Sequence, residues 1–171
     1  MFLGQEFQIN DWFIIHFTEN NGMAFGFEFG GIWGKLALSL FRLAAIGALG
    51  YFLYTLEKKK APTTAIVALS LILAGAIGNM IDSAFYGLIF NESLGQVASF
   101  LSEEGGYAGF LQGRVVDMFY FPIYSGYLPD WIPFWGGDYM VFFRPVFNIA
   151  DTAISTGIGI VIFFQRNLFN Q

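Results

Sequence analysis

The stretch Phe147-Asn148-Ile149-Ala150-Asp151 opens the last hydrophobic run of the chain, and Asp151 is the only formal charge in residues 146–164. About 19 residues at ~1.5 Å of rise each span roughly 28 Å, close to the hydrocarbon thickness of a bilayer. The run therefore predicts a membrane-spanning helix over 146–164. Asn148 and Asp151 share one face of this helix by their spacing. Because an ionisable residue in such a helix marks a functional site by default, we expect that face to look into a helix bundle.

The composition is that of an integral membrane protein. Of 171 residues, 56% are hydrophobic, 20% aromatic and only 12% charged, which is too apolar for a soluble domain of this length. The net charge of −5 and the scattered basic residues offer no patch for phosphates, so nucleic acid is excluded as a partner. With no cysteine and one histidine, His16, the chain lacks the parts of disulfides, zinc motifs and serine–histidine triads. Carboxylates, amides, hydroxyls and a few cations remain as catalytic groups.

Two further hydrophobic runs, 34–56 and 63–81, predict a pair of spanning helices joined by a short basic turn. Lys58 to Lys60 form the densest positive charge in the chain, and such charge stays on the cytoplasmic side of a membrane. The far ends of both helices, and the start of the 146–164 helix, are therefore expected outside. Arg42 lies about one to two turns into the first run. Its side chain either extends toward the outer surface or forms an ion pair inside the bundle.

Residues 1–33 alternate between apolar and polar positions. Two alternating arms, 13–17 and 23–29, flank Asn21-Gly22, and Asn-Gly between such arms is typical of a hairpin. We expect an extracytoplasmic β-hairpin with its aromatic side chains at the membrane surface. His16 is expected to be an interfacial side chain rather than a catalyst.

Residues 82–145 are expected to form an extracytoplasmic loop region. The part from Asn91 to Gly113 is small, polar and acidic, which is typical of a flexible loop. The stretch after it is rich in proline and aromatic residues, including Trp131 and Trp135, which is typical of the membrane–water boundary. The whole chain, 1–171, is then a single membrane domain. Its predicted fold is an all-α integral membrane bundle of three spanning helices with a small β-hairpin or β-sheet element outside.

One spacing occurs twice in the chain. Asn79-Met80-Ile81-Asp82 at the outer end of the second run repeats the spacing of Asn148-Ile149-Ala150-Asp151 at the outer start of the last. Taken alone this signal is weak, because helix ends also attract such residues as caps. The topology strengthens it, since both pairs are expected at one depth on the outer side. Gly113-Arg114-Val115-Val116-Asp117 lies in the loop between them, so a third carboxylate, Asp117, can reach the same place.

Four sequence blocks together resemble the lipoprotein signal peptidases, or signal peptidase II, a family of bacterial membrane aspartic peptidases. Residues 20–25 (Asn-Asn-Gly-Met-Ala-Phe) resemble the family's Asn-x-Gly-Ala-Ala-Phe block, and residues 78–82 resemble its Gly-Asn-x-x-Asp-Arg block. Residues 113–117 resemble Gly-x-Val-Val-Asp, and residues 147–151 resemble Phe-Asn-x-Ala-Asp. Each block is short, but four in order with matching membrane placement make a specific match.

The resemblance implies an aspartic endopeptidase that needs no metal or cofactor, with Asp117 and Asp151 as the catalytic pair. Around the substrate and this pair it implies Asn20, Gly22, Asn79, Asp82 and Asn148. Family substrates are prolipoproteins bearing a diacylglyceryl cysteine, and cleavage before that cysteine releases the signal peptide. Such enzymes are multi-pass proteins of the bacterial cytoplasmic (inner) membrane with the active site near the outer face. Prolipoprotein and membrane lipid are therefore the implied partners.

Two carboxyl groups in one site suit this chemistry, because both cannot ionise cheaply. One stays protonated and polarises the scissile carbonyl, while the other takes a proton from water. Asp151 is the candidate for the ionised partner because it lies at a helix N-terminus, where the helix dipole favours an anion. Coupled titration leaves this assignment open.

The chain departs from the family pattern in two places. Ser83 stands where the family has an arginine, and Arg114 and Arg144 are the candidates to replace it. Family members also have four spanning helices, the first with an Asp-Gln-x-x-Lys element, and nothing of that kind precedes residue 34. We therefore expect Met1 to be an internal methionine of a longer protein.

Two other functions stay open on the sequence: a small transporter or ion-binding membrane protein, and a non-catalytic binder of lipidated chains. Transporters place such sites near the bilayer midplane, whereas the residues here gather near one surface. This placement favours the peptidase.

Overall fold

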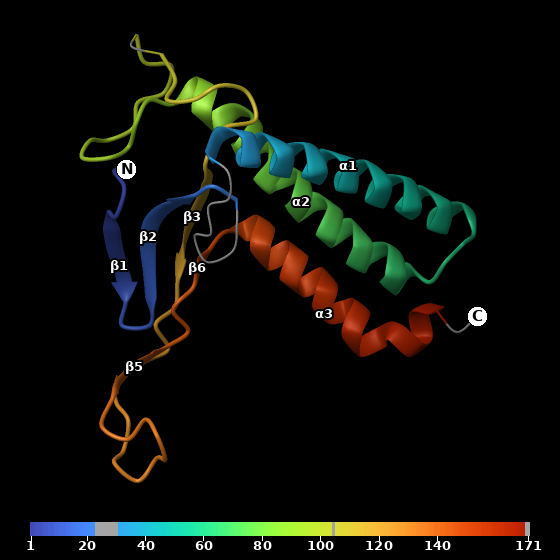
Figure 1. Ribbon diagram of the computed structural model, residues 1–171. Coiled ribbons are helices and arrows are strands. Elements are labelled where there is room, and N and C mark those ends of the chain that lie inside the picture. Colours follow the sequence, from blue (N-terminus) through green and yellow to red (C-terminus); the bar gives the residue numbers. More distant parts are fainter. Residues whose placement is uncertain (23–30, 104, 170–171) are drawn as a thin grey trace.

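The computed structural model describes residues 1–22, 31–103 and 105–169, the last five of these by their backbone alone. Its elements are β1 (Glu6–Asn10), β2 (Phe13–Asn20), α1 (Gly31–Lys58), α2 (Thr63–Ile89), β3 (Val115–Tyr120), β4 (Tyr124–Tyr127), β5 (Tyr139–Phe142), β6 (Val146–Phe147) and α3 (Ile149–Phe169). The helices lie side by side, and the strands stand at one end of them and cross their direction (Figure 1). The predicted combination of helices with a small antiparallel sheet is confirmed.

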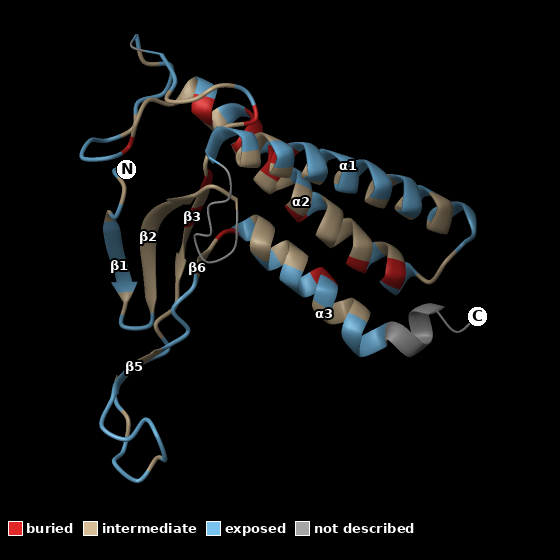
Figure 2. Ribbon diagram, viewed as in Figure 1, coloured by how far each residue is buried: buried red, intermediate tan, exposed pale blue. Residues whose placement is uncertain are grey.

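The helices α1 and α2, of 28 and 27 residues, are long and apolar enough to cross a membrane. The helix predicted over 146–164 begins at Ile149, because Val146 and Phe147 pair with β3 as strand β6. Its described apolar part, Ile149–Phe164, is shorter than α1 and α2. Large apolar side chains along α1, such as Phe41 and Tyr51, are exposed, and exposed residues follow most of that helix in Figure 2. An apolar surface of this extent is unsuited to water and suited to lipid.

The helices α2 and α3 approach closely because glycine lies at their contact. A Cβ on Gly157 of α3 would lie 2.5 Å from the carbonyl oxygen of Ala68 on α2. A Cβ on Gly75 of α2 would run into the carbonyl of Ala150 on α3. Small residues bring helix backbones together in this way inside membranes. The contact sets the start of α3 against the middle of α2.

The larger sheet is antiparallel throughout, with the strand order β1-β2-β3-β6. The hairpin it contains is formed by β1 and β2, in which Glu6 pairs with His16. Asn10 makes the turn between them, because its side chain accepts a hydrogen bond from Trp12 N at 3.0 Å. The predicted arm 13–17 is therefore a strand, but its neighbours are β1 and β3. The second predicted arm, 23–29, lies outside the described residues.

The segment 91–113, predicted to be a flexible loop, packs on the end of α2. This helix continues to Ile89, past the expected end at residue 81, so residues 82–89 are helical rather than loop. The segment then folds back, and Gly113 N donates to the carbonyl of Ser83 at 2.8 Å. Leu111 is buried in a cluster with side chains of α2. Its described residues form neither a helix nor a named strand, as expected of a loop, and several of its backbone N–H groups bond carbonyls of the last turns of α2. The flexibility of the segment stays a prediction.

Gly157→Val is expected to destabilise the protein, because the new side chain forces α3 away from α2. Overpacking of this kind costs about 1–3 kcal/mol. Gly159→Val is the matched control on the same helix, since a Cβ there meets nothing within 4 Å. Thermal unfolding in detergent measures both variants. Equal melting temperatures would contradict the close helix contact.

Candidate active site

Asp117 lies on β3 and is only 4% exposed. Its strand begins with two valines, and β-branched residues suit a strand covered on both faces. Both carboxylate oxygens accept hydrogen bonds from amide side chains. Asn20, the last residue of β2, donates to Oδ2, and Asn148 Nδ2 donates to Oδ1 at 2.8 Å. Three of the sequence blocks therefore meet at this carboxyl group.

Asn148 directly precedes α3 and links Asp117 to Asp151. Its Oδ1 accepts a hydrogen bond from Asp151 N at 3.0 Å, and its own N–H donates to Asp151 Oδ2 at 3.3 Å. This reciprocal pair is a capping box. Its Nδ2 also donates to Asn79 Oδ1 at 3.0 Å, while Asn79 Nδ2 donates to Asp151 Oδ1 at 2.9 Å. Asn148 is thus both a helix cap and the link between two carboxyl groups.

Asp82 lies one turn after Asn79 on α2 and holds the strand that carries Asp117. Its Oδ2 accepts a hydrogen bond from Val116 N at 3.3 Å, and Asn148 Nδ2 donates to Val116 O at 3.2 Å. These side chains satisfy backbone groups of β3 that lie beyond its short pairing with β6. Both α2 residues lie within the helix rather than at its outer end, because α2 is longer than predicted.

Burial raises the pKa of Asp117 to about 6, and the negative charge of Asp151 adds to the rise in pKa. The hydrogen bonds from Asn20 and Asn148 stabilise the anion and oppose that rise. A carboxyl group in this environment keeps its proton at a pH where an ordinary aspartate has lost it. The two carboxyl groups can therefore hold one proton and one negative charge between them.

Gly22 forms a turn after β2 and meets Arg42 from α1. Its N–H donates to Asn20 Oδ1 at 2.5 Å, and its φ of +84° lies in the region that glycine adopts freely. Its carbonyl accepts a hydrogen bond from Arg42 Nη2, and a side chain at this position would run into the guanidinium. The charge of Arg42 also interacts with that of Asp151. Among the described side chains Arg42 forms no ion pair, and its guanidinium instead extends to the backbone of the turn after β2.

The sequence motifs did not point to Arg42 as a site residue. Arg144, one of the two suggested replacements for the arginine missing at residue 83, is exposed. Ser83 itself is buried where the segment after α2 packs on the helix. The signal for Arg42 is nevertheless present in the sequence, because an arginine within a hydrophobic run needs a partner.

Arg114, the other suggested replacement, belongs to an ion cluster beside the site. It donates to Glu92 Oε1 at 2.6 Å and to Glu19 Oε2 at 2.9 Å, and its guanidinium lies 4.7 Å from the ring centre of Tyr107. The hydrogen bond with Glu92 contributes most to raising the pKa of Arg114, and it lowers the pKa of Glu92. Glu19 and Asn20 are neighbours in β2 and so lie on opposite faces of the sheet. The cluster therefore links the segment after α2 to β2, on the face of the sheet opposite to Asn20.

A pocket of about 390 Å³ opens beside the network, between α2, β3 and the start of α3. Its polar lining includes Asn79, Asp82 and Asn148. Much of the rest is small and apolar: Ala74, Gly75, Gly78, Ala150 and Ala153. Within the described segments, no three or more histidine or acidic side chains are grouped to hold a metal ion.

The fold defines a helical membrane protein whose sheet and helices meet at a buried polar site. The family model for signal peptidase (SPase) II matches residues 1–166, and the chain belongs to this family. It is similar to the lipoprotein signal peptidase of Porphyromonas gingivalis, with 53% identity over 163 residues that cover 95% of this chain and 71% of the relative. The lipoprotein signal peptidase of Amoebophilus asiaticus is 36% identical over 170 residues, which cover 99% of this chain and 68% of the relative.

Solved structures described as a bacterial membrane enzyme share the fold. One has a TM-score of 0.55 and 25% identity, and the match covers 96% of this chain and 77% of that one. A second has the same TM-score at 24% identity, covering 100% and 77%. Together with the family assignment, this likeness makes the chain a membrane peptidase.

Arg42→Gln is expected to lower peptidase activity, because Gly22 loses its charged donor and Asp151 loses a neighbouring positive charge. Hydrogen bonds to charged groups contribute about 1.5–3 kcal/mol, so turnover should fall roughly 10- to 150-fold. Arg42→Lys keeps the charge and should retain more activity. The control is Arg144→Gln at an exposed position. Steady-state assays in detergent compare the three, and wild-type turnover in Arg42→Gln would remove this residue from the site.

Proposed function

We propose that this chain is an aspartic endopeptidase that removes signal peptides from lipoprotein precursors, with Asp117 and Asp151 as its catalytic pair. The observation that carries the proposal is the network in which Asn148 bonds both carboxyl groups. The family assignment and the names of the relatives support the substrate class. They also favour this function over the transporter considered from the sequence.

In this proposal Asp151 is the ionised partner and Asp117 holds the proton. Asp151 lies in the first turn of α3, where the helix dipole and the N–H of Asn148 favour an anion. The positive charge of Arg42 acts in the same direction. Asp117 lies away from any helix N-terminus, and burial raises its pKa to about 6 although the neutral amides of Asn20 and Asn148 oppose the rise.

Cleavage then proceeds in two steps of general acid–base catalysis. Asp151 takes a proton from water as the water oxygen attacks the scissile carbonyl carbon, and Asp117 gives its proton to the carbonyl oxygen. The resulting diol collapses when the C–N bond breaks. Asp151 gives its proton to the leaving amine of the lipidated cysteine, and Asp117 regains a proton from one diol hydroxyl. The new carboxyl group belongs to the signal peptide.

The remaining site residues position the pair. Asn20 and Asn148 hold the two oxygens of Asp117, and Asn79 holds Asp151. Asp82 acts on Asp117 indirectly, by accepting a hydrogen bond from the backbone N–H of Val116. Gly22 forms the turn after β2, and its N–H donates to the side chain of Asn20. We assign the largely apolar pocket lined by Asn79 and Asn148 to an apolar part of the precursor, because small side chains leave that space open beside the two amides that bond the pair.

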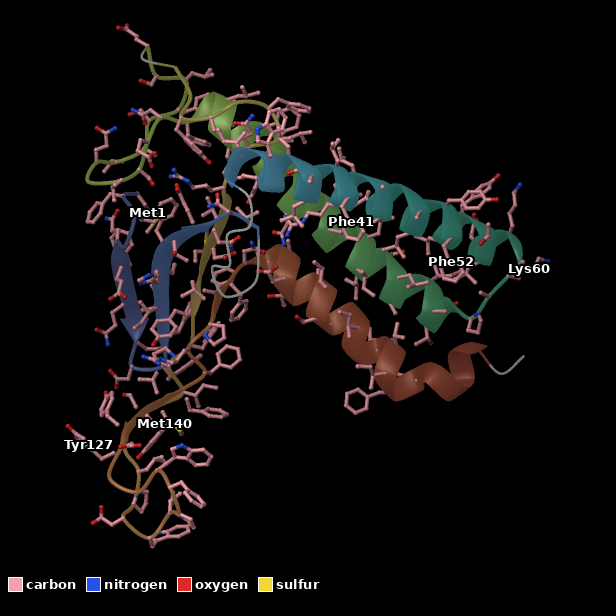
Figure 3. All side chains as sticks on the ribbon, viewed as in Figure 1. Met1, Phe41, Phe52, Lys60, Tyr127 and Met140 are labelled. Atoms are coloured by element: carbon pink, nitrogen blue, oxygen red, sulfur yellow. The ribbon has the colours of Figure 1, made fainter. Side chains whose placement is uncertain are left out.

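The enzyme is a multi-pass protein of the bacterial cytoplasmic membrane, spanned by α1, α2 and α3, and 1–171 forms a single membrane domain. Lys58 is the last residue of α1, and Lys59 and Lys60 lie in the turn that leads to α2. This turn is at the end of the helices away from the sheet, where Figure 3 labels Lys60. Because such charge stays cytoplasmic, the sheet and residues 91–145 lie outside. The site is then near the outer face, and the diacylglyceryl cysteine of the precursor reaches it from the surrounding lipid.

Asp117→Asn and Asp151→Asn are each expected to abolish most turnover, because an amide can neither share the proton nor act as a base. Each variant should lose more than about tenfold, or ~1.4 kcal/mol of transition-state stabilisation, and the expected loss is orders of magnitude. The assay is release of the signal peptide from a diacylated precursor. Asp11→Asn, in the exposed turn between β1 and β2, is the isosteric control. Retention of a tenth or more of the wild-type rate in either variant would refute the pair.

The rate of cleavage should fall as the pH rises through about 6. Asp117 must hold its proton for catalysis, and burial raises its pKa to about that value. Measurements of kcat/KM from about pH 5 to about pH 9 should show an alkaline limb whose apparent pKa belongs to the coupled pair. A flat profile across this range would contradict a protonated Asp117.

A further inference from the structure

The hairpin of β4 and β5 carries aromatic side chains that the site does not use. At its turn, Trp131 is 79% exposed, Phe134 97% and Trp135 64%. Its strands add further exposed rings: Tyr124, Tyr127, Tyr139 and Phe142. Residues 124–142 are called the aromatic hairpin below. Large apolar side chains gathered on one projection mark a contact with something other than water.

The turn of the aromatic hairpin satisfies many of its own backbone groups. The closing bonds run from Leu128 N to Asp138 O at 2.9 Å and from Gly137 N to Leu128 O at 3.0 Å. Inside the turn, Ile132 N donates to Pro129 O at 3.1 Å, Gly136 N to Ile132 O at 3.0 Å and Asp138 N to Trp135 O at 3.1 Å. Donors that are bonded internally need no water, so the turn can enter a less polar medium at low cost.

The aromatic hairpin extends beyond one end of the larger sheet, roughly along its strands and across the direction of the helices (Figure 1). Figure 3 labels Tyr127 and Met140 on it, with Lys60 at the opposite end of the helices. In the proposed orientation the helices cross the membrane and the sheet lies at their outer end. A hairpin that runs across the helix axes from this position follows the membrane surface.

We propose that the aromatic hairpin inserts its tip, Trp131, Phe134 and Trp135, into the outer interface of the bilayer that the helices span. The inference rests on the proposed function for its membrane orientation. Tryptophan is the side chain most suited to this boundary, since its ring is apolar and its N–H stays within reach of water. The charged residues of the hairpin are Asp130 and Asp138, with no lysine or arginine. Ring burial, rather than attraction to anionic headgroups, therefore drives the insertion.

The position of the aromatic hairpin in the chain gives the insertion a consequence for catalysis. It follows β3, which carries Asp117, and leads through β6 to Asn148 and Asp151. An anchor at its tip therefore holds Asp117, on β3, and Asp151, on α3, at the depth in the membrane at which a membrane-bound precursor presents its cleavage site. Losing the anchor should weaken capture of that precursor and leave the chemical step unchanged, so KM rises while kcat stays.

Insertion is tested by depth measurement on the 171-residue chain, which contains no cysteine. Phe134→Cys carries an environment-sensitive fluorophore, and the protein is reconstituted in phosphatidylethanolamine–phosphatidylglycerol vesicles. Leu94→Cys is the matched control, an apolar residue 71% exposed in the segment that follows α2. Spin-labelled lipids should quench the label at residue 134 and not at residue 94, with no change at about 1 M salt. Quenching of the label at residue 134 by aqueous iodide, and not by spin-labelled lipid, would overturn the proposal. The exposed rings would then be a binding surface for a protein partner.

Activity supplies the second measurement. Phe134→Ser and the combined Trp131→Ser, Phe134→Ser and Trp135→Ser variant are assayed on a diacylated precursor in vesicles. Their KM should rise, by about tenfold for the combined variant, with kcat within about twofold of wild type. Trp12→Ser, an exposed tryptophan at the β1–β2 turn, is the control. Unchanged KM in both variants would overturn the anchor while leaving the peptidase intact, whereas absence of cleavage by the wild-type chain would count against the proposed function alone.

Discussion

The side-chain amide of Asn148 is the contact on which the rest of the site depends. It lies where the sheet ends and α3 begins, donates to Asp117 at 2.8 Å, and accepts the backbone N–H of Asp151 at 3.0 Å. One residue thereby positions two aspartates that come from a strand and from a helix, because its backbone N–H also donates to Asp151 Oδ2. Because an amide does not titrate in the physiological range, this link stays the same whichever carboxyl group holds the proton.

That link requires the close packing of α2 and α3. Asn79 on α2 bonds both Asn148 and Asp151, so the start of α3 must lie within hydrogen-bond reach of α2. Gly75 and Gly157 permit this approach, since a Cβ at either position would meet the backbone of the facing helix. The polar network therefore requires the close helix contact. A wider spacing of α2 and α3 would lengthen the hydrogen bonds from Asn79 and displace Asp151.

Features that depend on local sequence patterns were predicted correctly. Features that depend on contacts between segments far apart in the chain were not. The apolar runs located α1 and α2, and the Asn-x-x-Asp spacing selected side chains that the structure brings together with Asp117. The end of α2 was misplaced because the apolar run ends before Asp82 and Ser83, whereas backbone donors from residues 105–113 stabilise a longer helix. The neighbours of β2 and the contacts of Arg42 depend on chain segments far away in sequence. No local spacing encodes them.

The asymmetry between the two aspartates follows from the elements that carry them. Asp151 opens a helix, so it receives a backbone N–H, the positive end of the helix dipole and the nearby charge of Arg42. Asp117 lies within a covered strand, so burial acts on it with only neutral amides as partners, and its pKa rises. Two identical side chains placed in such different surroundings are driven toward different protonation states. In the proposed mechanism, this difference separates the acid from the base without any further group.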